Sequence, residues 1–184
     1  MNAIDLLKED HDTVRELFAS LEATTKRGAK KRTDLLAKIA QALEAHTTIE
    51  EEIFYPAFKA AAEEADDAAM YYEAIEEHRA AGDLVLPDLQ ATDPTTDRFS
   101  GRAKVLKELV EHHAREEEKE MFPKARKLLG AKALRELGET MQQRKAELMR
   151  KPVARKAPVV APRAEARNAG ADRRRTPVSS AASQ

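Results

Sequence analysis

Two stretches of this sequence share an order of residues that can bind a metal ion. The first is HTTIEEEIFYP, which starts at His46, and the second is HAREEEKEMFP, which starts at His113. Each places a glutamate four residues after its histidine, at Glu50 and at Glu117. Residues four apart on an α-helix project within about 40° of each other, so each histidine is expected to point the same way as its glutamate.

The two stretches are copies within an internal repeat. The differences 113 − 46, 117 − 50 and 123 − 56 all equal 67, and the difference 78 − 11 gives the same offset for two further histidines. The repeat predicts two similar helical hairpins, each with a single histidine on its first helix and a His-x-x-x-Glu pair on its second. The candidate metal ligands are therefore His11, His46, Glu50, His78, His113 and Glu117.

A metal centre would explain why ionisable residues lie on apolar stripes. All six candidates fall on the apolar faces of predicted helices, and no Lys or Arg lies on those faces within the same turns. An unpaired charge in a bundle core costs several kcal/mol. Two divalent cations would offset that cost, with the carboxylates bridging them. A set of imidazoles and carboxylates without thiolates suits iron, manganese or zinc.

Other residues near the motifs are given lesser roles. His112 adjoins a candidate ligand but diverges from it by about 100° on a helix, so we expect it outside the ligand set or at the surface. Only one glutamate of each run, 50–52 and 116–118, can point inward, and the others are assigned to solvated faces. Tyr55 and Phe122 correspond in the repeat and are predicted to pack in the core, with Tyr55 close enough to neighbour a redox centre.

Apolar residues recur at steps of three and four along most of the chain, which predicts helix throughout. Four long amphipathic helices are expected around residues 4–21, 36–53, 71–89 and 106–121, and a shorter one around residues 134–148. Pro56 is expected to kink or end the second helix. Short connections between long amphipathic helices are typical of a bundle, so the predicted fold is an all-α, up-down antiparallel four-helix bundle with an extra C-terminal helix packed outside it.

The last part of the chain differs in composition from the rest. From residue 150 onward, nine basic residues face two acidic ones, a charge of 9 − 2 = +7, which leaves −8 on the rest of a chain whose net charge is −1. With four of the eight prolines and no aromatic residue, this segment cannot offset its chain entropy by burial and is predicted to be disordered. The expected organisation is a bundle at 1–130, an additional helix at 131–149 and a basic Pro/Ala-rich tail at 150–184.

Composition also bounds the partners and the compartment. The basic tail is compatible with contact to nucleic acid or an acidic partner, and also with a solubilising role alone. The chain has no cysteine, which excludes disulfides and thiolate ligands. Its first residues lack the pattern of a secretory signal, and no apolar run reaches membrane-spanning length. A cytoplasmic protein without a membrane span is expected, and its oligomeric state stays open.

These residues resemble the haemerythrin-like proteins, whose unit is also called the HHE cation-binding domain. The resemblance covers roughly residues 1–128 and is carried by a single His followed by His-x-x-x-Glu-Glu-x-x-x-x-Pro, the whole repeated. It implies a four-helix bundle that holds two non-haem iron ions joined by an oxo or hydroxo bridge. By the resemblance, the four candidate histidines are terminal iron ligands, and Glu50 and Glu117 bridge the irons.

The sequence departs from the oxygen-carrying members of that family. Those members have a fifth histidine one turn before the third-helix ligand, where this chain has Ala74, and one turn after that ligand stands Gly82. Their second bridging carboxylate comes five residues after its histidine, whereas Glu117 comes four after, and Glu118 stands at the fifth position as a competing candidate. A missing imidazole leaves an open metal position, which favours peroxide breakdown, iron oxidation or sensing over reversible oxygen carriage.

Three functions are compatible with these patterns. The first is an enzyme of oxidative stress with catalase-like or peroxidase-like activity. The second is a protein that binds or senses oxygen, nitric oxide or iron without turnover and reports through its tail. The third is a metal-free helical interaction protein. Metal content separates the third function from the others, and peroxide turnover separates the first from the second.

Overall fold

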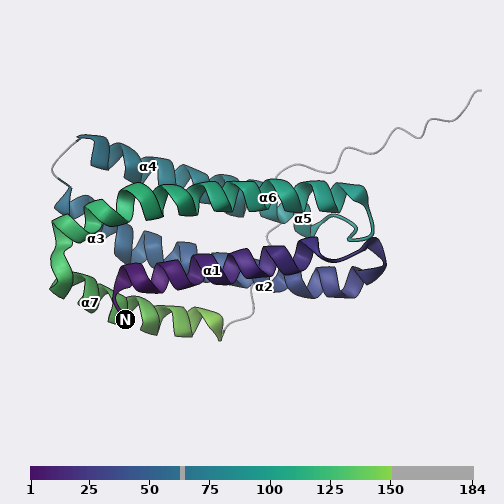
Figure 1. Cartoon of the computed structure of the whole chain (residues 1–184), viewed down its shortest axis with the longest axis horizontal. Coiled ribbons are helices and arrows are strands. Elements are labelled where there is room, and N and C mark those ends of the chain that lie inside the picture. Colours follow the sequence, from purple (N-terminus) through teal and green to yellow (C-terminus); the bar gives the residue numbers. More distant parts are fainter. Residues whose placement is uncertain (63–64, 151–184) are drawn as a thin grey trace, which may run out of the picture.

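Helices make up almost all of the described chain (Figure 1). The structure is a computed structural model and describes residues 1–62 and 65–150. Its helices are α1 (Ala3–Glu22), α2 (Ala29–Ile49), α3 (Tyr55–Ala61), α4 (Ala65–Arg79), α5 (Leu86–Gln90), α6 (Asp97–Glu116) and α7 (Phe122–Met149), with a 3₁₀ turn η1 (Lys26–Gly28) and the π-helical segments η2 (Glu50–Phe54), η3 (Ala80–Val85) and η4 (Glu117–Met121). From residue 151 on, the predicted tail lies outside the described residues.

These elements form four long antiparallel rods. The first rod is α1, the second is α2 with η2 and α3, the third is α4 with η3 and α5, and the fourth is α6 with η4 and the first part of α7. In Figure 1 the first two rods lie together as one hairpin, and the next two lie beside them as another. The predicted all-α, up-down four-helix bundle is confirmed.

Polar side chains fix where two of the rods begin. The side chain of Asn2 accepts a hydrogen bond from the Asp5 amide at the start of α1, and the Thr96 hydroxyl accepts one from the Phe99 amide at the start of α6. The first amides of a helix have no partner within it, so these caps stabilise both starts. Each rod therefore enters the bundle at a defined residue, which sets the height of the histidine further along it.

The chain turns back at Gly130. This residue has a φ of 73°, which glycine adopts without steric cost. After the break, the rest of α7 runs beside α1 and α2 (Figure 1). A Cβ atom at Gly138 would lie 2.7 Å from backbone atoms of Asn2 and Ala3, so only glycine permits this close approach. The additional helix is thus fixed against the outer side of the first hairpin.

Each π-helical segment precedes a proline. Pro56, Pro87 and Pro123 lie in the first turn of α3, α5 and α7. A proline lacks an N–H and clashes with the carbonyl four residues earlier. One residue before Pro56, the Tyr55 amide donates to the carbonyl of Glu50, five residues back. At Pro56 we expected a kink or an end, and the structure instead has a widened turn through which helical hydrogen bonding continues.

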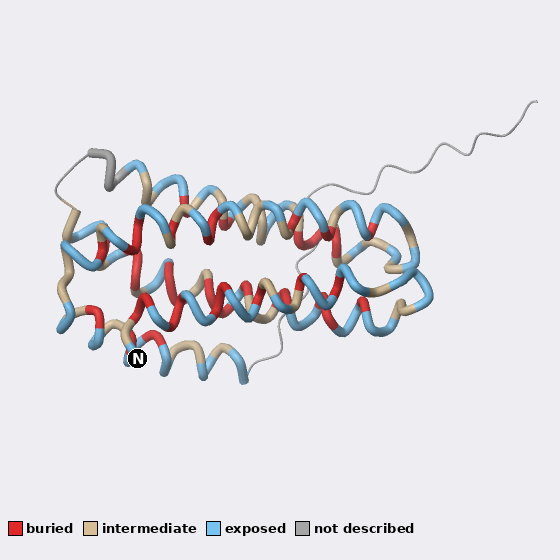
Figure 2. The backbone as a smooth tube through the Cα atoms, viewed as in Figure 1, coloured by how far each residue is buried: buried red, intermediate tan, exposed pale blue. Residues whose placement is uncertain are grey.

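Buried residues lie along the inner faces of the rods (Figure 2), and the apolar ones among them form two clusters. One cluster includes Leu7 and Ile49, and the other includes Val14 and Leu43. Along α1, His11 lies between Leu7 and Val14, and along α2, His46 lies between Leu43 and Ile49. A buried polar layer therefore separates the two apolar clusters.

Candidate metal centre

The six candidate ligands meet inside this polar layer. Their exposed fractions are His11 4%, His46 4%, Glu50 0%, His78 7%, His113 6% and Glu117 2%. They come from α1, α2, η2, α4, α6 and η4, so each of the four rods contributes one histidine, and the second and fourth rods each add a glutamate. Burial of two carboxylates with four imidazoles shows that the rods are arranged around these side chains.

The candidates form two clusters that share Glu50. The first cluster is His11, His46, Glu50 and Glu117, and the second cluster is Glu50, His78 and His113; within each cluster the potential ligand atoms lie within 4.8 Å of one another. Glu50 reaches both clusters, since Oε1 is 3.3 Å from His46 Nε2 and Oε2 is 3.3 Å from His78 Nε2. Glu117 Oε2 lies 3.2 Å from His11 Nε2 and 3.6 Å from His113 Nε2. Both carboxylates therefore lie between histidines of different clusters.

Each imidazole turns its Nε2 atom towards the centre, because its Nδ1 atom faces a carboxylate further out. Nδ1–oxygen distances are 2.8 Å for His11 to Glu118, 2.8 Å for His78 to Glu51, 2.8 Å for His113 to Glu77 and 3.5 Å for His46 to Asp10. We call these four acidic residues the outer carboxylates. In the three pairs at 2.8 Å the carboxylate can accept a hydrogen bond from Nδ1, which places the proton there and leaves the Nε2 lone pair for a metal ion.

The outer role of these carboxylates was not predicted: Glu51 was assigned to a solvated face, Glu118 was considered as a bridging ligand, and Asp10 and Glu77 were not singled out. The repeat contains them, since the differences 77 − 10 and 118 − 51 both equal 67. Asp10 and Glu77 precede the single histidine of each hairpin and reach the second histidine of the same hairpin. Glu51 and Glu118 follow the ligand glutamates and reach across to the other hairpin. The signal in the sequence was that both copies of the repeat have an acidic residue at these two positions.

Tyr55 also reaches the centre. Its hydroxyl donates to Glu117 Oε1 at 2.9 Å and lies 3.3 Å from Nε2 of His78 and 3.5 Å from Nε2 of His113. On a regular α-helix, Tyr55 would project about 140° away from Glu50. Because η2 closes its hydrogen bonds over five residues rather than four, it returns Tyr55 to the inner face. The phenol oxygen thus lies where it can also reach a metal ion held by the second cluster.

Phe122 occupies the equivalent place at the first cluster. It stacks on the His11 ring with centroids 5.9 Å apart, as Tyr55 stacks on the His78 ring with centroids 5.5 Å apart. Both aromatic side chains are buried, as the sequence predicted for the core. Each cluster therefore has an aromatic ring stacked on one of its imidazoles, but the ring at the second cluster carries a hydroxyl and the ring at the first does not.

Several buried nitrogen and oxygen atoms of these side chains lack a hydrogen-bond partner in the protein and could instead bind a cation. In the described part of the chain, the buried side-chain atoms without a hydrogen-bond partner are Asp10 Oδ2, His11 Nε2, His46 Nδ1, His46 Nε2, Glu50 Oε1, Glu50 Oε2 and Glu117 Oε2. All of them belong to this centre. Nε2 of His78 and Nε2 of His113 lie 3.0 Å apart, where they form a hydrogen bond if one of them is protonated and repel each other if both protons are on Nδ1. The residues present therefore suit bound metal ions.

The charge states of the centre lead to the same conclusion. Burial, with Glu117 close by, raises the pKa of Glu50 well above its ordinary value. Burial alone would raise the pKa of Glu117 as well, but the imidazoles around it, those of His113 and His11 first, lower it. Burial lowers the pKa of His46 to about 4, which keeps this imidazole neutral. A bound cation would favour the ionised form of both carboxylates.

Glu118, the competing candidate for a bridging role, lies outside both clusters. Its Oε1 atom bonds to His11 Nδ1 at 2.8 Å and to the Arg15 guanidinium at 2.9 Å. The side chain is therefore held on the outer side of the histidine, away from the Nε2 atoms. Glu117 takes the inner position.

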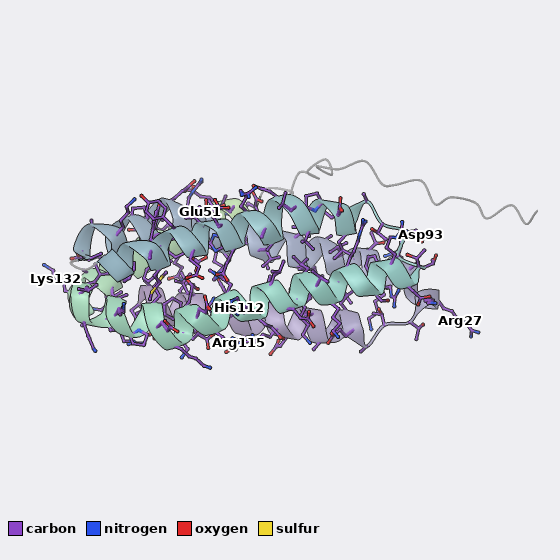
Figure 3. All side chains as sticks on the ribbon, turned by 90° about the horizontal axis from the view of Figure 1, so that it is seen from above. Arg27, Glu51, Asp93, His112, Arg115 and Lys132 are labelled. Atoms are coloured by element: carbon purple, nitrogen blue, oxygen red, sulfur yellow. The ribbon has the colours of Figure 1, made fainter. Side chains whose placement is uncertain are left out.

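His112 lies at the surface. Its side chain is 53% exposed, and its Nε2 atom lies 3.4 Å from Glu77 and 3.2 Å from Glu116. Figure 3 shows His112 midway along the bundle, between Lys132 at one end and Arg27 at the other. It is thus level with the centre but outside the buried clusters.

Two cavities reach the centre from different sides. The first has a volume of about 350 Å³ and is lined by all four candidate imidazoles together with aliphatic side chains such as Val14, Ile75 and Leu109. The second has a volume of about 320 Å³ and is lined by His113, Glu117 and the further glutamates Glu73, Glu77, Glu116 and Glu120. One approach to the centre is therefore largely apolar, and the other is acidic.

Four rods that each carry an inward histidine, with two glutamates shared between them, define a haemerythrin-like metal-binding helical bundle. The model of the haemerythrin HHE cation binding domain matches residues 2–125, and the chain belongs to this family. Among residues 1–62 and 65–150, no helix has the length and apolar content needed to cross a lipid bilayer.

Two relatives extend the comparison. A protein of Nostoc sp. described as a DNA nickase is 30% identical over 131 residues, which cover 71% of this chain and 35% of that protein. The chain thus spans about a third of that relative's length. The crystal structure of a haemerythrin HHE cation binding domain-containing protein from Mycobacterium kansasii matches with a TM-score of 0.70 at 28% identity, over 81% of this chain and 88% of that chain.

Proposed function

We propose that the centre binds two iron ions, one in each cluster, and decomposes peroxide in the cytoplasm with catalase-like or peroxidase-like activity. The proposed ligands are His11, His46, Glu50, His78, His113 and Glu117. The observation that carries the proposal is the pair of buried clusters that share Glu50 and adjoin a cavity lined by all four imidazoles. A pair of irons supplies the two electrons that each peroxide molecule exchanges.

The protein's own groups would hold the metals close and control protons. Glu50 and Glu117 lie between the clusters, so each carboxylate can bind both metals and reduce their mutual repulsion. The outer carboxylates fix the orientation of the imidazoles. The Tyr55 hydroxyl, 2.9 Å from Glu117 Oε1, holds a proton within reach of the second cluster.

The first cavity suits a small neutral substrate. Its exposed surface is more apolar than polar, and it includes Gly82, where a Cβ atom would meet no atom within 4 Å. Gly82 lies one turn after His78, where an additional ligand side chain would otherwise project. Hydrogen peroxide carries no charge and is small enough for the cavity.

Metal content and oxygen evolution test the proposal together. We expect protein purified without added metal to contain about two irons per chain and to convert two molecules of hydrogen peroxide into one of oxygen and two of water. His113→Ala removes a ligand of the second cluster and should abolish oxygen evolution with loss of iron. His112→Ala, its exposed neighbour, is the matched control and should retain both. Turnover no faster than that of free iron, in protein with full metal content, would exclude the enzyme.

A second candidate is a protein that senses oxygen, nitric oxide or iron at this centre and contacts DNA. The similarity to a DNA nickase and the predicted basic tail favour it. The candidate ligands are at most 7% exposed, so a DNA backbone cannot reach them, and we expect no nicking of supercoiled plasmid. Gel-shift assays of the full chain and of a chain that ends at residue 150 check whether the tail binds DNA.

A further inference from the structure

Lys145, in the last part of α7, contacts the periphery of the centre. Its ammonium group donates a hydrogen bond to Asp10 Oδ1, while Asp10 Oδ2 lies 3.5 Å from His46 Nδ1. Asp10 is only 6% exposed. A chain of contacts therefore runs from Lys145 through Asp10 to His46, whose Nε2 atom faces the first cluster.

The segment that carries Lys145 is held firmly in place. Gly138 packs directly on the backbone at Asn2, and the Arg144 guanidinium forms two hydrogen bonds with Glu52, at 2.7 and 2.9 Å. The Gln41 side chain donates to the Met149 carbonyl at 3.0 Å. Both ends of this segment are thus tied to the first hairpin, although it lies beyond residue 125, where the family match ends.

Asp10 interacts more weakly with its histidine than the other outer carboxylates do. The other three Nδ1–oxygen distances are 2.8 Å, against 3.5 Å for Asp10. Asp10 is one methylene shorter than Glu77, its counterpart in the repeat, and Lys145 holds its second oxygen. Arg15 contacts Glu118 too, but on the same oxygen that His11 uses, so it does not draw that carboxylate away.

We propose that Lys145 is a positioning residue that draws Asp10 away from His46, so that no short hydrogen bond forms between them, and thereby makes the first cluster the more easily reduced of the two metal sites. The inference rests on the proposed function, in that it requires a metal ion in each cluster. A carboxylate that accepts strongly from Nδ1 makes an imidazole a stronger donor to its metal. A nearby cation opposes the higher charge of the oxidised metal. By drawing Asp10 from His46 and by adding a positive charge, Lys145 favours the reduced metal in both ways.

The test compares reduction potentials of the iron-loaded protein by spectroelectrochemistry. In Lys145→Met the equilibrium constant for one-electron reduction of the first cluster should fall about tenfold, which corresponds to about 59 mV. Lys145→Arg keeps the positive charge, so its reduction potential should stay near that of the parent protein. Lys132→Met makes the same charge change on the same helix at a side chain 86% exposed and should have no effect.

A double-mutant cycle separates positioning from a general loss of stability. If Lys145 acts through Asp10, Lys145→Met should shift the potential much less in an Asp10→Asn background than alone. Equal shifts in both backgrounds, or no shift for Lys145→Met in protein with two irons per chain, overturn the inference while leaving the proposed function intact.

Metal content is measured first, so that failure of the proposed function can be distinguished from failure of the inference about Lys145. Protein with fewer than two metal ions per chain contradicts the proposed function. The same variants are then titrated with Co²⁺, whose visible absorption reports imidazole binding. Lys145→Met should raise the affinity of the first cluster about tenfold, and an unchanged affinity overturns the inference.

Discussion

Tyr55 and Phe122 give the two halves of the centre different chemistry at equivalent positions. Both residues lie five places after a ligand glutamate, and both are turned inward by a π-helical segment. Only Tyr55 has a hydroxyl, which contacts Glu117 and both histidines of the second cluster. The protonated phenol of Tyr55 therefore gives the second cluster a hydrogen-bond donor that the first cluster lacks.

Tyr55→Phe should therefore change the second cluster without disturbing the fold. Phe122 already shows that a phenyl ring fits the equivalent place, so the backbone should not move. Loss of the hydrogen bond to a buried carboxylate should cost about 1–3 kcal/mol. We expect a lower melting temperature, measured by thermal unfolding. Tyr72→Phe removes a hydroxyl from an exposed ring and is the matched control, with no expected change in melting temperature.

At this scale the sequence predicted the six inner residues but not the outer ones. His46 and Glu50 could be paired because helical spacing alone brings them together. Glu51 could not, because its partner, His78, belongs to the other hairpin, and only the packing of the hairpins defines that contact. The repeat offset pairs Glu51 with Glu118, but the local sequence does not distinguish a glutamate that contacts a histidine from one that faces solvent.

The π-helical segments position the centre at the level of secondary structure. η2 and η4 begin at the two ligand glutamates, and η3 begins two residues after His78. Each widened turn changes which residues face inward just beyond a ligand. Pro56 signalled an irregularity, but a proline predicts a kink, an end or a widened turn with equal ease. The inward direction of Tyr55 therefore could not be derived from the sequence.

η3 also provides a test of access to the centre. Gly82 lines the largely apolar cavity and has open space around its Cβ position. Gly82→Leu should fill that space and lower kcat/KM for peroxide by about tenfold or more, with little change in iron content. Steady-state oxygen evolution and metal analysis check it. Gly101→Leu, at an exposed helical position with the same open surroundings, should leave both unchanged.

The whole bundle places a layer of charge between two apolar clusters. Unsatisfied buried polar atoms are concentrated in that layer, so the free energy of unfolding should depend on what binds there. The apolar clusters on either side were predictable from periodicity. The role of Lys145 was not, because it lies in a segment without a copy in the repeat and reaches Asp10 only through the turn at Gly130.

Metal removal should accordingly destabilise the molecule. A ligand present at a thousand times its Kd stabilises the folded state by about 4 kcal/mol, and a chain of this size loses about 2–4 °C of melting temperature per kcal/mol. Chelation should thus lower the melting temperature by roughly 10 °C, and added iron should restore it. Calorimetry with and without chelator checks this, and an unchanged melting temperature would support the metal-free interaction protein.

The contact between Lys145 and Asp10 joins residues 135 positions apart. Ribosomes add about 5–20 residues per second, so Asp10 is made roughly 7–27 s before its partner. During that interval the first hairpin lacks its outer cover, and Asp10 is free to turn fully towards His46. Because the first cluster also contains Glu117, its ligand set is complete only 28 residues before Lys145 is made, and a metal bound before the last helix docks would be loosened when Lys145 reaches Asp10.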